Sequence, residues 1–151
     1  MVRTRLATPA DAGDVARLLR DFNTEYDDVV PEHGVLTERM GRLITGGETS
    51  VLLVGDGPDG IAVLRFRQAI WAAGLECYLA ELYVAPDHRR KGFGRALMNA
   101  AIEHARTRGA AWMDLGTSED DAAARALYES LGFSNREGDG GPLQFYYERD
   151  L

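Results

Sequence analysis

The stretch that decides the fold is Ala80-Glu81-Leu82-Tyr83-Val84-Ala85-Pro86-Asp87-His88-Arg89-Arg90-Lys91-Gly92-Phe93-Gly94-Arg95-Ala96-Leu97-Met98. Apolar residues at Leu82 and Val84 indicate a strand, and the proline that follows ends it. Gly92 and Gly94 then let the backbone approach a ligand closely at the start of a helix. The first N–H groups of a helix lack intrahelical partners and lie at the positive end of its dipole. The stretch therefore predicts a strand, a basic turn and a helix start that together bind an anion.

Composition limits the class of protein. The 151 residues fit one domain, expected to span 1–151, with 45% hydrophobic and 27% charged residues as in ordinary globular proteins. No apolar run approaches the roughly 20 residues that cross a bilayer, and the N-terminus has no apolar stretch like that of a signal peptide. The single cysteine, Cys77, cannot form an internal disulfide, which fits a reducing compartment. We expect a cytoplasmic protein that does not bind membranes.

The net charge and the number of possible metal-binding side chains limit which partners and ligands the protein is expected to bind. The formal net charge is -7, whereas nucleic-acid binding depends on a broad basic face, so we expect no nucleic-acid partner. Three scattered histidines and one cysteine have no metal-ligand spacing, so we expect no metal. The positive charge is local, which suits a small phosphate ligand, and it surrounds the turn at His88, Arg89, Arg90, Lys91 and Arg95.

The rest of the chain alternates strand and helix patterns. Strand patterns cover 2–7, 50–54, 61–69, 75–84 and 111–115, another begins at Phe133, and a last one covers 143–148. Helical patterns run from a start signal at 8–11 to Phe22, over 36–44, over 92–108, and from a cap at 118–121 to Leu131. Hairpins at both ends of this series require a mixed sheet. We predict a single-domain α/β (mixed α+β) fold with a mixed central sheet of six or seven strands and about four helices, in the order β-α-α-β-β-β-α-β-α-β-β.

Three phosphate-binding motifs compete for the turn. A nucleotide P-loop needs Gly-x-x-x-x-Gly-Lys-Ser/Thr, which does not occur. A dinucleotide fingerprint needs a third glycine or alanine where Leu97 stands. The remaining pattern, Arg/Gln-x-x-Gly-x-Gly/Ala, is matched by 89–94.

This motif and a second block resemble the GCN5-related N-acetyltransferase (GNAT) superfamily over nearly the whole chain. Leu82-Tyr83-Val84-Ala85-Pro86 with Arg89-x-x-Gly92-x-Gly94 resembles the superfamily's acetyl-coenzyme A block. Ala124-x-x-Leu127-Tyr128-Glu129-x-Leu131-Gly132-Phe133, about thirty residues later, resembles its second block. The resemblance implies an N-acetyltransferase with the superfamily's fold, which uses acetyl-coenzyme A as donor by direct attack.

The resemblance also implies how the cofactor binds. Backbone groups of 82–84 would pair with the pantetheine arm as a sheet edge pairs with an added strand, and the Val84 N–H would polarise the thioester carbonyl. For this, the strand must splay from 111–115. Asp121 stands where many relatives have an asparagine, and capping of its helix is the alternative role. The implied cofactor-binding residues are Leu82, Tyr83, Val84, Arg89, Arg90, Lys91, Gly92, Phe93, Gly94, Arg95 and Asp121.

Two catalytic residues are candidates. The resemblance implies that Tyr128 gives a proton to the departing sulfur, and core packing is its alternative role. Several relatives have a glutamate that acts as general base where Gly116 stands here, so the role of general base cannot be assigned to this position. Glu81, on a strand expected to be buried on both faces, is our candidate base. A water chain to Asp114 or Glu119 is an alternative base, and a structural salt bridge is an alternative role for Glu81.

The acceptor is indicated only weakly. The segments 21–26 and 119–128 are similar to aminoglycoside 3-N-acetyltransferases of the same superfamily. Acidic residues between Asp21 and Glu32 form either a rim that attracts a cation or a solvated helix end. We expect a small cationic amine, aminoglycoside-like or polyamine-like. A protein or peptide acetyltransferase and a non-catalytic acetyl-coenzyme A sensor are the alternatives, and a homodimer is left open.

Overall fold

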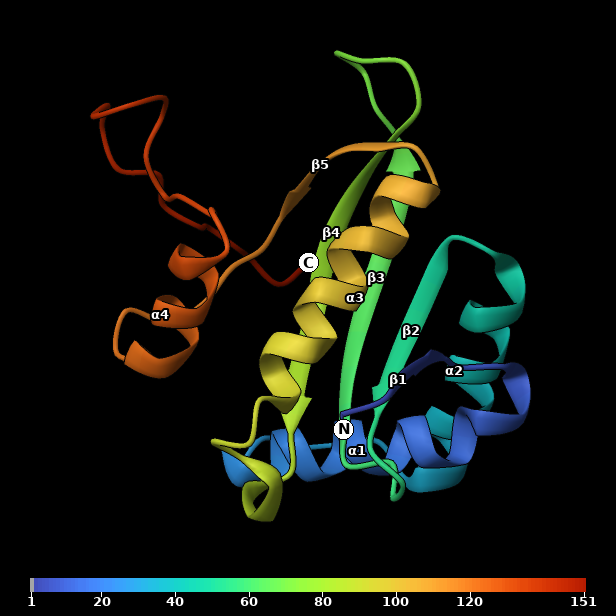
Figure 1. The fold of residues 1–151 in the computed structure, drawn as a ribbon. Helices are drawn as coiled ribbons and strands as arrows, with labels where there is room; N and C mark the ends of the chain where they lie inside the picture. The colour runs from blue at the N-terminus through green and yellow to red at the C-terminus, as the bar shows by residue number, and fades with distance from the viewer. Residues whose placement is uncertain (1) are drawn as a thin grey trace. The chain divides into compact units, whose positions relative to one another are not determined.

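The structure is a computed structural model and describes residues 2–151. The chain forms two compact units, one up to Leu115 and one from Gly116 to Leu151. The first unit contains the sheet and three of its helices, and the second contains one helix and the C-terminal segment (Figure 1).

The first unit is built on one mixed sheet with the strand order β1-β2-β3-β4-β5. The strands are β1 (Thr4–Leu6), β2 (Thr49–Val54), β3 (Gly60–Gln68), β4 (Leu75–Val84) and β5 (Ala110–Asp114). The first three pairings are antiparallel, and β5 lies parallel to β4. The mixed α/β sheet expected from the hairpin and crossover patterns is confirmed.

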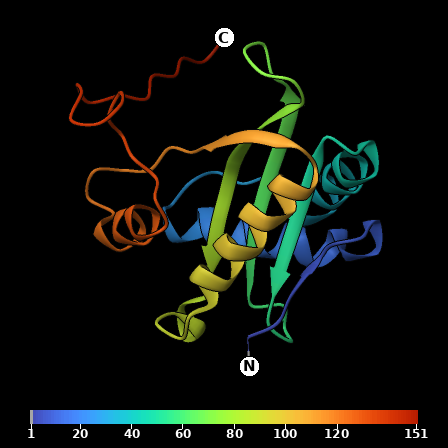
Figure 2. The ribbon, with the colours of Figure 1, turned by 45° about the horizontal axis from the view of Figure 1, so that its top comes forward.

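Helices cover both faces of this sheet (Figures 1 and 2). On one face lie α1 (Ala12–Glu25), which contacts β3 and β4, and α2 (His33–Gly46), which contacts β2. On the other face α3 (Phe93–Thr107) contacts β2, β3, β4 and β5. Short 3-10 turns precede α1 and α3, at Pro9–Asp11 and Pro86–His88. The core under α1 and α2 takes every second residue from three strands, which places these residues on one face of the sheet, and its buried members are Val15, Leu18, Leu19, Met40, Val51, Leu53, Ile61, Val63 and Tyr83.

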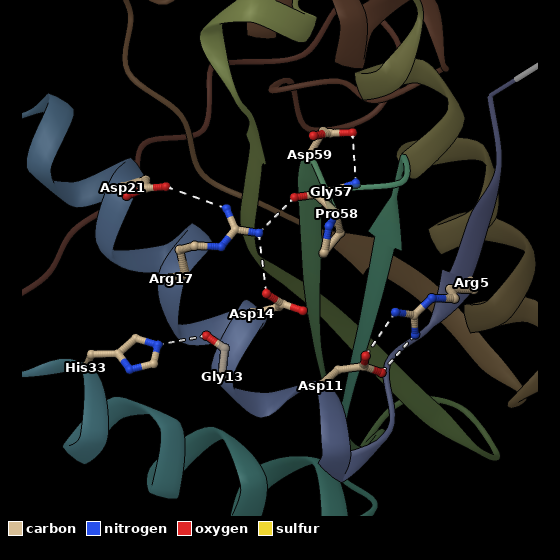
Figure 3. A network of polar contacts seen from close by, with 10 residues as sticks. All are labelled: Arg5, Asp11, Gly13, Asp14, Arg17, Asp21, His33, Gly57, Pro58 and Asp59. Atoms are coloured by element: carbon tan, nitrogen blue, oxygen red, sulfur yellow. Dashed lines mark hydrogen bonds and ion pairs between the residues drawn. The ribbon is translucent and has the colours of Figure 1, made fainter.

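Polar contacts join the N-terminal elements to one another and to the turn between β2 and β3 (Figure 3). The Arg17 guanidinium donates to the Pro58 carbonyl at 3.0 Å, which joins α1 to that turn. Arg5 donates to both carboxylate oxygens of Asp11, at 2.8 and 2.9 Å, which joins β1 to the turn before α1. The Arg5 guanidinium, together with the Thr8 N–H, lowers the pKa of Asp11 to about 2.

The second unit corrects two expectations. The helix α4 (Ala122–Ser130) begins after Asp121, rather than after the cap expected at Ser118. The expected C-terminal hairpin is wrong, because only an isolated bridge joins Arg136 to Leu143 and 143–148 forms no strand. The sheet therefore has five strands among the described residues, not six or seven. Alternating residues show that a segment could form a strand, but a strand also needs a partner edge.

Gly60 allows β3 to pass close to the end of β4. A Cβ there would lie 2.8 Å from Val54 Cγ1 and 3.0 Å from the Tyr83 carbonyl oxygen. We expect Gly60→Ala to lower the free energy of unfolding by about 1–3 kcal/mol, because backbone must move. Gly46→Ala, on α2 with no atom within 4 Å of its Cβ, is the matched control and should be neutral or stabilising by up to about 1 kcal/mol. Urea unfolding followed by tryptophan fluorescence measures both, and equal stability of the two variants would contradict the prediction.

Candidate active site

The edge of β4 that faces β5 is open over its C-terminal half. The parallel pairing with β5 joins Leu75 to Ala110, Cys77 to Met113 and Tyr78 to Asp114. It ends there, so that 79–84 has no strand partner on this side among the described residues. The expected separation from 111–115 applies only beyond Tyr78, because Cys77 and Tyr78 are still paired with Met113 and Asp114. An open parallel edge of this length can take an extended ligand as an added strand.

Hydrogen-bond alternation decides which residues face the open edge. The Ala85 N–H donates to the Asp59 carbonyl at 2.8 Å, and Val84 pairs in register with Gly60. In an antiparallel ladder this places the N–H and C=O of Leu82 and Val84 on the side away from β3. Tyr83, between them, has its backbone directed at β3. The open edge therefore presents the polar backbone groups of Leu82 and Val84.

The turn after β4 leads into an uncapped helix start. Arg90 and Gly92 have φ of +62° and +84°, and Gly92 is the N-cap residue of α3. No side chain caps the helix, so its first N–H groups stay available for a ligand. Alternation between left-handed and ordinary backbone makes a concave nest of N–H groups that binds anions. Arg90, Lys91 and Arg95 are exposed beside this nest, which we call the phosphate loop, residues 90–95.

Arg89 directs its side chain away from the phosphate loop. Its Nε donates to the Val84 carbonyl at 2.9 Å, and its Nη2 donates to the carboxylate of Glu25 at 3.0 and 2.8 Å. Tyr83 Oη also donates to Glu25, at 3.2 Å. Sequence reasoning missed this role of Glu25, because the acidic stretch around it gives no sign of a basic partner 64 residues later.

Glu81 lies on the face of β4 that α1 covers. It pairs in register with Val63, and Tyr83, two residues on, belongs to the core under α1. The pairing shifts between Val63 and Leu64, so Ala80 forms a bulge next to Glu81. Burial raises the pKa of the Glu81 carboxyl, and no salt bridge to it is found within residues 2–151. The salt-bridge alternative for Glu81 therefore has no support.

The acidic stretch after Asp21 is neutralised in part. Glu25 pairs with Arg89, and Asp21 lies 3.9 Å from Arg17 (Figure 3). Asp27 and Asp28 are exposed in the turn that ends α1. A shallow hollow of about 500 Å³ also borders α1, but none of its lining residues comes from β4 or the phosphate loop, the lining being Ala10, Gly13, Asp14, Arg17, Arg20, Asp21 and His33.

The second unit contains the other two candidates. Tyr128 on α4 is buried, with 8% of its surface exposed, and burial together with nearby Asp121 raises its pKa to about 12. Its ring lies 6.1 Å from that of Phe133, centroid to centroid. Asp121 is the N-cap residue of α4, and its Oδ1 accepts from the Ala124 N–H at 3.1 Å. Helix capping thus accounts for Asp121 without a ligand.

Two features are absent from residues 2–151. No group of three or more His, Cys, Asp or Glu side chains there is arranged to hold a metal ion. None of the helices in that range has the length and apolar character to span a bilayer.

Comparison with known proteins gives one family. The profile of the acetyltransferase (GNAT) family matches residues 15–133. A crystal structure of a candidate acetyltransferase from Arthrobacter sp. FB24 is 42% identical, covers 99% of this chain and 96% of its own, and has a TM-score of 0.92. The GNAT resemblance of the two sequence blocks is confirmed.

Relatives with named substrates differ from one another. The [ribosomal protein bS18]-alanine N-acetyltransferase of Escherichia coli (strain K12) is 46% identical over 59 residues, which span 39% of this chain and only 40% of that enzyme. An aminoglycoside acetyltransferase from an uncultured soil metagenomic sample, solved with sisomicin, is 16% identical, covers 99% of this chain and 97% of its own, and has a TM-score of 0.78. At that identity the likeness shows the fold alone.

The raised pKa of Glu81 makes stability depend on pH. The folded state favours the protonated carboxyl, so the penalty for burying its charge is absent below the ordinary pKa of 4.5, grows as pH rises from there to the raised pKa, and is constant above it. We expect Glu81→Gln to raise the melting temperature at about pH 8, with a gain that disappears toward about pH 4. Scanning calorimetry across this range measures it, with Glu38→Gln on the exposed face of α2 as control. A gain that is the same at every pH would contradict the burial of a charge at Glu81.

Proposed function

The chain belongs to the acetyltransferase (GNAT) family and is an N-acetyltransferase, and we propose that it transfers acetyl from acetyl-coenzyme A to the primary amine of a small cationic molecule. The family uses acetyl-coenzyme A as its donor. The observation that carries the proposal is the open edge of β4 leading into an uncapped helix start. These two features offer a surface for an extended arm followed by an anion.

The proposed cofactor contacts are mostly backbone groups. Leu82 and Val84 hold the pantetheine arm, and the phosphate loop holds the pyrophosphate through its N–H groups. Because Arg89 occupies the Val84 carbonyl, the Val84 N–H remains the group that can polarise the thioester carbonyl. The exposed cations of the loop, Arg90, Lys91 and Arg95, add charge complementarity to the phosphates.

Glu81 is the proposed base. The acceptor nitrogen attacks the thioester carbon, the C–N bond forms as the C–S bond breaks, and the proton lost by nitrogen goes to Glu81 directly or through water. A carboxylate with a raised pKa accepts a proton more readily than an ordinary one. Asp114, whose pKa burial also raises, is the alternative end of a water chain.

Tyr128 is the proposed partner of the departing sulfur, an assignment that rests on the resemblance and on its pKa. With a pKa of about 12, the phenol stays protonated at neutral pH. A phenol with so high a pKa is a weaker acid than a thiol, so complete proton transfer to the thiolate is unfavourable and hydrogen bonding to it is the less costly role. Solvent then supplies the proton that completes the free thiol.

Negative charge near the proposed base supports the choice of a cationic acceptor. The Tyr83–Glu25 bond places the end of α1 over the part of β4 that contains Glu81. Asp27 and Asp28 are exposed in the turn beyond Glu25, where the negative end of the α1 dipole adds to their charge. These groups favour a cationic amine. The amino terminus of a protein is the second candidate, supported by the likeness to the bS18-alanine enzyme.

An acceptor panel tests the proposal. Aminoglycosides, polyamines, basic amino acids and peptides with free N-terminal alanine are incubated with acetyl-coenzyme A, and free thiol release is followed against an acceptor-free control. We expect the fastest release with a small polycation. Turnover restricted to peptides would replace the small-molecule proposal with the second candidate, whereas tight cofactor binding without any turnover would indicate a sensor.

Replacing Tyr128 by phenylalanine, which removes only the phenol oxygen, tests its proposed role as the partner of the departing sulfur. We expect Tyr128→Phe to lower kcat about 100-fold, because one hydrogen bond to the developing thiolate is lost, and to leave the Kd for acetyl-coenzyme A within about a factor of two. Steady-state kinetics and calorimetric titration measure the two quantities. The control is Phe133→Leu, which changes the neighbouring ring but keeps the phenol. A Kd that rises as much as kcat falls would assign Tyr128 to packing instead.

A further inference from the structure

One carboxylate joins the end of α1 to the turn before the phosphate loop. Glu25 accepts two hydrogen bonds from Arg89 Nη2, at 3.0 and 2.8 Å, and one from Tyr83 Oη at 3.2 Å. The same guanidinium donates through Nε to the Val84 carbonyl at 2.9 Å. Arg89, the residue immediately before the phosphate loop, thereby connects the last residue of α1 with the last residue of β4.

Aromatic packing keeps this junction rigid. The buried Tyr83 ring stacks on Phe22 of α1, with centroids 5.1 Å apart and ring planes at 19°. The Arg89 Cζ lies 5.7 Å from the Tyr83 ring centroid. Side-chain exposure is 28% for Glu25 and 47% for Arg89, against 75% and 73% for the Glu103–Arg106 pair on α3. The Glu25–Arg89 pair is therefore less screened by solvent than an ordinary surface ion pair.

We propose that Glu25 is a positioning residue for cofactor binding, acting through Arg89. The residue after Arg89 is Arg90, whose φ of +62° lies in the left-handed region that residues other than glycine rarely adopt. Such a conformation persists where the surrounding contacts fix it. Arg89 supplies that constraint on one side of Arg90, and Gly92 gives conformational freedom on the other. Without the Glu25 carboxylate, the guanidinium loses its charged partner, and the loop can relax so that its N–H groups no longer converge.

This inference rests on the proposed function, since it requires that the wild-type protein bind coenzyme A. The probe is coenzyme A itself, titrated calorimetrically into wild type, Glu25→Gln, Arg89→Met and the double variant. We expect Glu25→Gln to raise the Kd about fivefold or more when Arg89 is present, and by less than about twofold in the Arg89→Met background. A residue that merely supports the fold would have the same effect in both backgrounds.

The outcomes of the titration distinguish a failure of the proposed function from a failure of the role proposed for Glu25. No binding by wild type overturns the proposed function and this inference together, whereas binding by wild type with an unchanged Kd in Glu25→Gln overturns this inference alone. Equal losses in the two backgrounds, or tighter binding by Glu25→Gln, also overturn it, the latter because Glu25 would then be holding Arg89 away from the phosphates. Glu103→Gln, which removes one carboxylate from an exposed pair, is the matched control and should leave the Kd unchanged.

A second variant keeps the inference testable if Glu25→Gln does not fold. Arg89→Lys retains the positive charge but cannot donate to Val84 and Glu25 with one planar group. We expect it to weaken coenzyme A binding as much as Arg89→Met does. A Kd equal to that of wild type would show that only charge matters at this position and would overturn the inference.

Discussion

The rest of the site depends on a single constraint, the end of β4–β5 pairing at Tyr78 and Asp114. Each backbone N–H and C=O that is unpaired at a sheet edge needs another hydrogen-bond partner. For this reason the open edges of sheets are usually short, blocked or covered. Here the open segment ends beside a helix that no side chain caps and whose first N–H groups have no acceptor within the helix. Unpaired backbone groups on two adjoining elements define a continuous binding track, and the proposed cofactor has an extended arm and an anion that match its two parts.

Where β4 leads into α3, this track requires positive φ angles and a close approach of β3 to β4, and residues of the neighbouring elements make both possible. Gly60 lets β3 approach within van der Waals limits of the Tyr83 carbonyl, and Gly92 adopts a φ of +84° where α3 begins. Arg90 has no such freedom, so its φ of +62° depends on what fixes the residues around it. The Arg89 side chain provides a fixed point by bonding both to β4 and to α1. Helix α1, which contacts β4, thereby also contacts the residue that precedes the phosphate loop.

Local patterns predicted most of the fold, and long-range partners could not be predicted. The strand at 75–84 and the helix that starts near Gly92 follow from apolar spacing, proline and glycine, which act within a few residues. The strand expected at 143–148 failed because its pattern does not reveal whether a partner edge exists. The Glu25–Arg89 pair was missed for the same reason, since each charge has many potential partners in the sequence. Burial of Glu81 could be expected from its strand, but its face followed only from the observed register.

The division between backbone and side-chain chemistry explains why the acceptor is harder to infer than the donor. In the proposed site, the donor is bound by backbone N–H and C=O groups, which any sequence with the right turns can present. In this proposal, acceptor choice depends on the proposed base, Glu81, and on a few acidic side chains such as Asp27, which can change while the backbone stays the same. Two of the acidic side chains in this region, Asp21 and Glu25, are already paired with arginines. The charge available to an incoming amine is therefore smaller than a count of acidic residues suggests, and it is concentrated in the turn that ends α1.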